Sequence, residues 1–147
     1  MNVYSASSAG KAAGMPLDTL QRYLDRKQIS LQPCDQASGG SGQPRGFSSR
    51  RVTQLAIVRE LTSLGIGPSR AAKAAFAFSD RGNPGREIGQ LYPDSTTILV
   101  GLPRGENRVV SIPPDRSISD VLSHDTTAFI LILDPLVARI NSHLDSL

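Results

Sequence analysis

The sequence predicts an α+β protein in which a helical first half is followed by a small ββαβα unit. Apolar residues recur three and four positions apart up to about residue 78, which is typical of amphipathic helices. From residue 91 onward, short runs rich in Val, Ile and Thr alternate with turn residues, which is typical of strands. The 147 residues therefore divide into a helical domain at 1–78, a linker at 79–90 and a second unit at 91–147.

Two short helices are expected at the start of the chain. Ser5 is placed to cap a helix from Ala6 to Ala13, and Gly14 suits the left-handed exit of that helix. Pro16 fits the first turn of a second helix that continues to about Lys27. Two short helices joined by a Gly-containing turn are typical of a helix-turn-helix.

Two further helices follow a long loop. Residues 29–31 are compatible with a short strand, and residues 32–47 are rich in Gly, Ser and Pro, which indicates a flexible loop. Ser48 then caps a third helix that ends near Leu64 and whose apolar face includes Leu64. Residues 68–78 form a helix of small residues that begins at a Pro.

The last third of the chain has the pattern of a small α/β unit. Strands at 95–101 and 108–112 form a hairpin, a short helix follows at 118–123, and a strand at 126–133 leads into a helix at 136–144. A unit of fewer than about 60 residues is marginally stable alone. Either docking on the first domain or pairing with a second copy would relieve this, and we expect self-association as a homodimer.

Composition excludes several classes of protein. No apolar run reaches the roughly 18 residues that a membrane span needs, and the N-terminus lacks the apolar segment of a signal peptide, so we expect a cytoplasmic protein. Cys34 is the only cysteine, which rules out an intramolecular disulfide and a Cys-rich metal site. No nucleophile motif or complete phosphate-binding loop is present, so we expect no enzymatic activity, no metal and no cofactor.

Charge is distributed unevenly along the chain. Residues 1–90 contain 12 of the 16 Lys and Arg but 6 of the 13 Asp and Glu, a balance of +6, whereas residues 91–147 have a balance of −3. A basic half joined to an acidic half is expected where only one half meets a polyanion.

The ordered elements through residue 78 resemble the winged helix-turn-helix DNA-binding domain of the MerR family and its excisionase-like relatives. The resemblance rests on Tyr-Ser-Ala at 4–6 with Ala-Ala-Gly-Met at 12–15, Thr-Leu-Gln-Arg-Tyr-Leu at 19–24, Arg-Gly-Phe-Ser-Ser-Arg-Arg-Val at 45–52, Leu-Ala-Ile-Val-Arg-Glu-Leu at 55–61 with Leu-Gly-Ile at 64–66, and Pro-Ser-Arg-Ala-Ala at 68–72. It implies a recognition helix at 19–24 and a wing in the loop at 32–47. The chain departs from the family in its Gln-Arg-Tyr at 21–23, its longer Gly-rich loop, its lack of a long helix after residue 78 and its lack of effector cysteines.

The resemblance and the chemistry of the side chains together give a set of candidate DNA contacts. We expect Gln21 and Arg22 to read base edges, and cations near the helix ends to contact phosphates. An arginine at the end of the wing suits the backbone or the minor groove. The full set is Leu17, Asp18, Thr19, Gln21, Arg22, Arg26, Lys27, Arg45, Ser49, Arg50 and Arg51. Ordinary structural roles remain open for several of them: Asp18 as a favourable charge at a helix start, and Arg50 and Arg51 as solvated side chains.

The sequence thus predicts a bacterial- or phage-type transcriptional regulator that binds double-stranded DNA as a homodimer at the nucleoid. Two alternatives stay open. One is an excisionase-like architectural factor that bends DNA at a recombination site, and the other is a protein-interaction adaptor that has lost DNA binding. The sequence does not identify a small-molecule effector.

Overall fold

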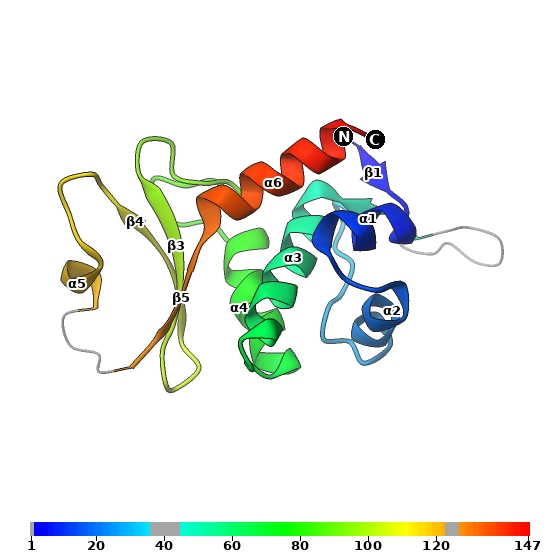
Figure 1. Ribbon diagram of the computed structural model, residues 1–147, viewed down its shortest axis with the longest axis horizontal. Coiled ribbons are helices and arrows are strands. Elements are labelled where there is room, and N and C mark those ends of the chain that lie inside the picture. The colour runs from blue at the N-terminus through cyan, green and yellow to red at the C-terminus, as the bar shows by residue number, and fades with distance from the viewer. Residues whose placement is uncertain (1, 36–44, 123–126) are drawn as a thin grey trace.

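The computed structural model describes residues 2–35, 45–122 and 127–147, and it confirms the predicted α+β class (Figure 1). Most of the expected wing, and the expected start of the last strand, lie outside these ranges. None of the helices described there has the length and apolar character needed to cross a membrane. The elements in chain order are β1 (Val3–Tyr4), α1 (Ala6–Ala13), α2 (Leu17–Asp25), β2 (Phe47–Ser48), α3 (Ser49–Ser63), α4 (Pro68–Ser79), β3 (Thr96–Gly101), β4 (Asn107–Ile112), α5 (Ile118–Val121), β5 (Phe129–Ile132) and α6 (Leu133–Asp145).

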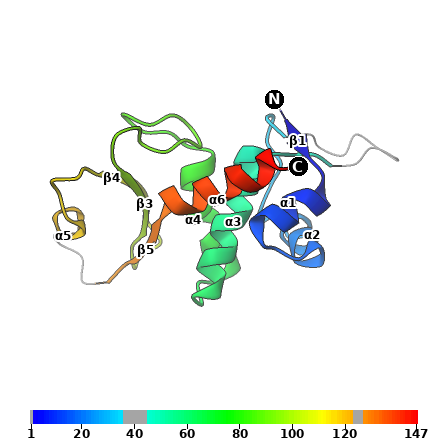
Figure 2. The same cartoon turned by 45° about the horizontal axis from the view of Figure 1, so that its top comes forward.

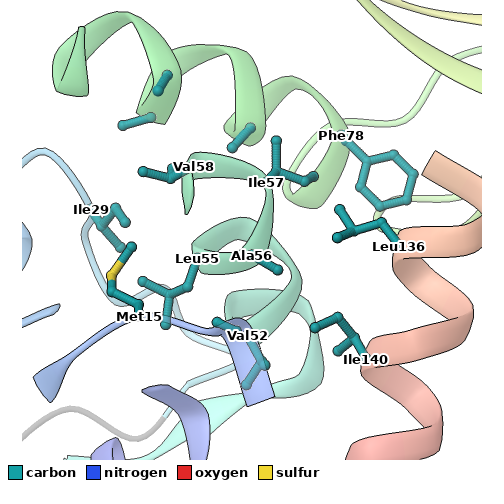
Figure 3. Close-up of a cluster of buried hydrophobic side chains, with 14 of the residues drawn as sticks. Met15, Ile29, Val52, Leu55, Ala56, Ile57, Val58, Phe78, Leu136 and Ile140 are labelled. Atoms are coloured by element: carbon teal, nitrogen blue, oxygen red, sulfur yellow. The ribbon is translucent and has the colours of Figure 1, made fainter. Parts of the chain in front are cut away.

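Helix α3 lies at the centre of the molecule and is buried on all sides along residues 51–58. Figure 3 shows its apolar side chains facing α4 on one side, α6 on another, and Met15 and Ile29 on a third. A helix surrounded in this way needs no polar face, so the one-sided apolar stripe expected from the sequence is wrong. Leu64, expected on that stripe, is 69% exposed just beyond the helix end.

A three-stranded antiparallel sheet lies at the opposite end of the molecule from α1 and α2 (Figures 1 and 2). Its order is β4-β3-β5, with Leu99 of the central strand opposite Val109 and Leu131. Alternate residues of β3 face opposite sides of the sheet, so Leu99 joins the main core while Ile98 and Val100 form a second cluster. Gly101 pairs with Phe129, and a Cβ at this glycine would overlap the Phe129 ring.

Helix α6 connects the sheet to the helical half, running from the end of β5 to the vicinity of β1 in both views (Figures 1 and 2). Its apolar face, Leu133, Leu136, Ile140 and Leu144, belongs to the same core cluster as α3 and α4. Where β3 begins, the Asp134 carboxylate accepts a hydrogen bond of 2.7 Å from the Thr97 amide. Residues 91–147 therefore pack against the helical half and share its core, which is one of the two ways in which so small a unit gains stability.

Residues 79–90, where the sequence predicts a linker, are ordered between α4 and β3. The reason is Arg86, whose side chain is buried and donates hydrogen bonds to the carbonyl groups of five residues. These carbonyls belong to Ala77, Phe78, Arg81, Glu87 and Gln90. Burial lowers the pKa of this guanidinium, and nearby Tyr92 raises it in part. The segment is therefore folded around one buried cation, although its Gly- and Pro-rich sequence gives no local sign of this.

The expected strand at 29–31 is absent. The amides of Gln28 and Ile29 instead donate hydrogen bonds to the Tyr23 carbonyl. This folds the chain back against the end of α2 and buries Ile29. The strand that does form after the loop, β2, pairs antiparallel with β1 at the N-terminus.

Candidate nucleic-acid interface

Helices α1 and α2 form a tight helix–turn–helix pair. Ser5 caps α1 by accepting a hydrogen bond from the Ser8 amide, and Gly14 ends it in the left-handed conformation at φ 73°. A Cβ at Gly10 would lie 2.7 Å from the Met15 carbonyl oxygen, so the turn passes against α1 at the one helical position without a side chain. Arg59 of α3 donates to the Gly14 carbonyl, which ties the turn to the core helix.

The two faces of α2 differ sharply. Leu20 and Tyr23 are buried in the core, and this places the opposite side of the helix in solvent. Most of the expected DNA contacts lie on this outer face or directly after the helix, and all of them are exposed except Thr19, which is half-buried. They are Leu17, Asp18, Thr19, Gln21, Arg22, Arg26 and Lys27. The structure therefore brings these seven residues together on a single surface.

Weak internal contacts hold this surface without neutralising its cations. The Gln21 amide donates to Asp25 at 2.9 Å, and one Arg22 nitrogen lies 3.4 Å from the Thr19 hydroxyl. No ion pair within the described part of the chain involves Arg22, Arg26 or Lys27. Their guanidinium and ammonium groups remain free for an external anion.

Lys27 has an unusual backbone conformation. Its φ of 57° lies in the left-handed region, and it is the only non-glycine residue there within the described ranges. The conformation is disfavoured for a side chain with a Cβ, by about 1–2 kcal/mol. It turns the chain sharply after α2 and leaves the lysine side chain exposed.

The expected contacts near the wing are less accessible. Ser49 is exposed at the start of α3, and Arg45 is half-buried. Arg50 is also half-buried, with Nη1 placed 3.7 Å from the Cys34 sulfur atom, and it packs beside Gly89. Arg50 therefore has partners of its own, although part of its surface is exposed.

Arg51 is the clear departure from the expected set. Its side chain is 0% exposed, its Nε lies 3.0 Å from Asp35, and two of its nitrogens lie 2.7 and 2.8 Å from the two oxygens of Asp80. It also donates to Gln54. A guanidinium enclosed in this way cannot reach a phosphate, so the prediction that Arg51 contacts DNA is wrong. Its role is to join the loop at Asp35, the start of α3 and the end of α4.

Asp35 was not singled out by the sequence because nothing local marks it. Its oxygens accept hydrogen bonds from the amide and hydroxyl of Ser48 and from the amide of Gln32. Burial alone would raise the pKa of this carboxyl group, but the hydrogen bonds from Ser48 and Gln32, with the charge of Arg51, outweigh burial and lower the pKa. Asp35 thus remains ionised and anchors the chain next to the described end of the loop.

The surface around Arg26 and Lys27 continues into a groove of about 750 Å³ beside α4 and the β3–β4 turn. Lys73 and Arg81, which the sequence does not mark as DNA contacts, lie along the same groove. They were missed because α4 reads as a small-residue packing helix and Arg81 falls in the expected linker.

No family model and no curated protein matches this chain. The resemblance to the MerR family therefore rests on the ordered motifs alone, and any function has to be inferred from the chemistry of the α2 surface.

Proposed function

We propose that this chain is a transcriptional regulator that binds specific double-stranded DNA through the outer face of α2. The observation that supports this most is that α2 buries only Leu20 and Tyr23 and presents Gln21, Arg22 and Arg26 outward. Glutamine and arginine are side chains that form paired hydrogen bonds with base edges in the major groove. The adjacent cations at Arg26 and Lys27 suit phosphates, which position a protein without reading sequence.

The packing behind α2 is suited to holding such a reading helix rigid. Gly10 allows the turn to approach α1 closely, and Arg59 hydrogen-bonds to that turn from the central helix. A recognition element supported by a packed core loses little conformational freedom on binding. The MerR-like resemblance of the sequence agrees with this assignment, and the expected wing in the loop at 32–47 is proposed as a second DNA contact.

Self-association as a homodimer remains part of the proposal, because helix-turn-helix proteins commonly read two half-sites. Within the described residues, β4 and β5 are the edges of the sheet, and each has one side without a strand partner. Sedimentation of the protein with and without duplex DNA measures this directly. A monomer bound to a single site would remove the dimer from the proposal and leave the reading helix in place.

The direct test is selection of duplexes from a random pool, followed by affinity measurements over a range of salt concentrations. Arg22→Ala should weaken binding to the selected sequence by about tenfold to a hundredfold and affect random duplex much less, as expected for a base contact worth about 1–3 kcal/mol. Arg26→Ala should weaken both duplexes alike and reduce the salt slope by about one. Arg116→Ala, an exposed cation near α5, serves as the matched control and should change neither.

The outcomes separate the alternatives. Failure to enrich any duplex would remove the DNA-binding proposal and place the adaptor hypothesis first. An enriched motif at promoters supports transcriptional control, whereas tandem motifs beside an integrase site would replace it with the excisionase-like role.

A further inference from the structure

The groove beside α4 has the dimensions of a ligand site. Its floor is one face of α4, formed by residues three and four positions apart, and its walls are the segment after α2 and the β3–β4 turn. The floor residues are Ser69, Ala72, Lys73, Phe76 and Ala77. Its volume of about 750 Å³ falls in the range of small-molecule sites, about 300–1,000 Å³.

The charge of the lining points to an anion. Four cations line the groove, namely Arg26, Lys27, Lys73 and Arg81, against the single carboxylate of Glu106. None of the four is in an ion pair with another described residue. A concave surface lined by one sign of charge concentrates the field and attracts ligands of opposite sign.

The other groups in the groove suit a flat ring carrying hydrogen-bonding groups. The Arg81 guanidinium lies over the Phe76 ring, 5.6 Å from its centroid, and both residues line the groove. Gln28 and Gln32 contribute amides to the lining. Asn107 also lines the groove, and its side-chain oxygen is buried without a hydrogen-bond partner in the described structure. The side chain of Asn107 thus adds a polar amide beside those of Gln28 and Gln32.

We propose that this groove binds a nucleotide, with its phosphates at Lys27 and Lys73 and its base against Arg81 and Phe76. The cavities beside Cys34, beside Asn83 and beside Lys11 lack this combination of a cationic lining and an aromatic surface. A bound nucleotide also neutralises Arg26 and Lys27 and thereby weakens DNA binding. This regulatory consequence, unlike the binding itself, rests on the proposed function.

Calorimetric titration of the full chain with ADP and GDP tests the binding. Pyrophosphate and adenosine serve as probes for each half of the ligand. At least one nucleotide should bind, and each half should bind at least about tenfold more weakly, since each loses one set of contacts. Lys73→Ala should weaken nucleotide binding by about tenfold to a hundredfold, the loss expected for one charge-assisted hydrogen bond. Lys11→Ala is the matched control, because Lys11 is an exposed lysine within a helix and lies outside the groove.

Each contrary result has a definite meaning. If neither nucleotide binds, or if the two lysine variants lose affinity equally, the groove is not a nucleotide site. If pyrophosphate alone binds as tightly as ADP and GDP, recognition of the base is wrong. If no nucleotide binds but Lys73→Ala weakens duplex binding and lowers its salt slope, the groove belongs to the DNA interface and the proposed function survives. If nucleotides bind while no duplex does, the groove proposal survives and the proposed function fails.

Discussion

Replacing Arg51 tests whether this residue belongs to the core or to the proposed DNA-binding surface. Arg51→Met keeps much of the side-chain volume but leaves the Asp35 and Asp80 carboxylates, whose side chains are 0% and 5% exposed, without their cation. Removing one partner of a buried ion pair typically costs about 3–5 kcal/mol, because the remaining charge stays buried. Against a total stability of about 5–15 kcal/mol, this is a large fraction. At about 2–4 °C per kcal/mol for a chain of this size, the melting temperature should fall by about 10 °C.

The pH dependence gives the prediction a second, independent readout. In the folded protein the pKa of Asp35 is below its ordinary value, so this carboxylate stabilises the fold above about pH 4 and the contribution is lost as the pH falls through the folded pKa. Without Arg51, burial is opposed by fewer favourable interactions and the pKa of Asp35 rises. The difference in stability between wild type and variant should therefore be largest near pH 7 and shrink toward pH 4.

Urea unfolding followed by circular dichroism at pH 7 and pH 4.5 measures both effects. The matched control is Arg139→Met, which removes an exposed cation whose partner Glu60 lies 3.2 Å away on α3, and which should change stability by no more than about 1 kcal/mol. Equal effects of the two variants, or a gap that does not change with pH, would refute the argument. Weakened DNA binding by Arg51→Met with unchanged stability would show that Arg51 is a surface contact after all.

Three further substitutions test other features of the fold. Gly10→Ala places a Cβ against the Met15 carbonyl oxygen and should lower the free energy of unfolding in urea by about 1–3 kcal/mol, although Gly→Ala within a helix is ordinarily stabilising. The control Ser7→Ala, on the exposed side of α1, should not destabilise the protein. Equal effects of the two variants would contradict the close approach of the turn to α1. Lys27→Gly removes the left-handed strain and should raise the unfolding free energy by about 0.5–1 kcal/mol while weakening DNA binding, and a loss of stability would contradict the strain. Arg86→Lys keeps the charge but cannot serve five carbonyl groups, so stability should fall by about 2 kcal/mol, and native-like hydrogen exchange in residues 79–90 would oppose this role.

Features with local causes were predictable from the sequence. Helix α1 spans the expected residues because Ser5 caps it and Gly14 takes the left-handed exit, and both signals lie within one turn of the helix ends. The hairpin strands and the end of α4 lie within one residue of their predicted bounds. Local periodicity also places Leu20 and Tyr23 on the buried face of α2, but Leu17, which has the same spacing, is 54% exposed.

Features that depend on distant partners were not predictable in this way. Arg51 pairs with Asp80, 29 positions further along the chain. The residues next to an arginine at a helix start do not distinguish a buried side chain from a solvated one. The burial of α3 on all sides requires α6, which joins the core from the other end of the chain. Likewise, a Gly- and Pro-rich segment reads as a linker unless Arg86 is known to point inward.

The first 90 residues keep their excess of positive charge after these corrections, although Arg51 does not contribute to it at the surface. Burial withdraws Arg51 and Arg86 from the surface of the first 90 residues, and it also withdraws Asp35 and Asp80. Two of 12 cations and two of 6 carboxylates are removed together, so the balance of the groups that remain is still +6. The buried charges therefore serve folding, while the excess positive charge that we propose attracts DNA lies entirely outside them. Removing the exposed cations of α2 should reduce DNA affinity at little cost in stability, and removing Arg51 should do the reverse.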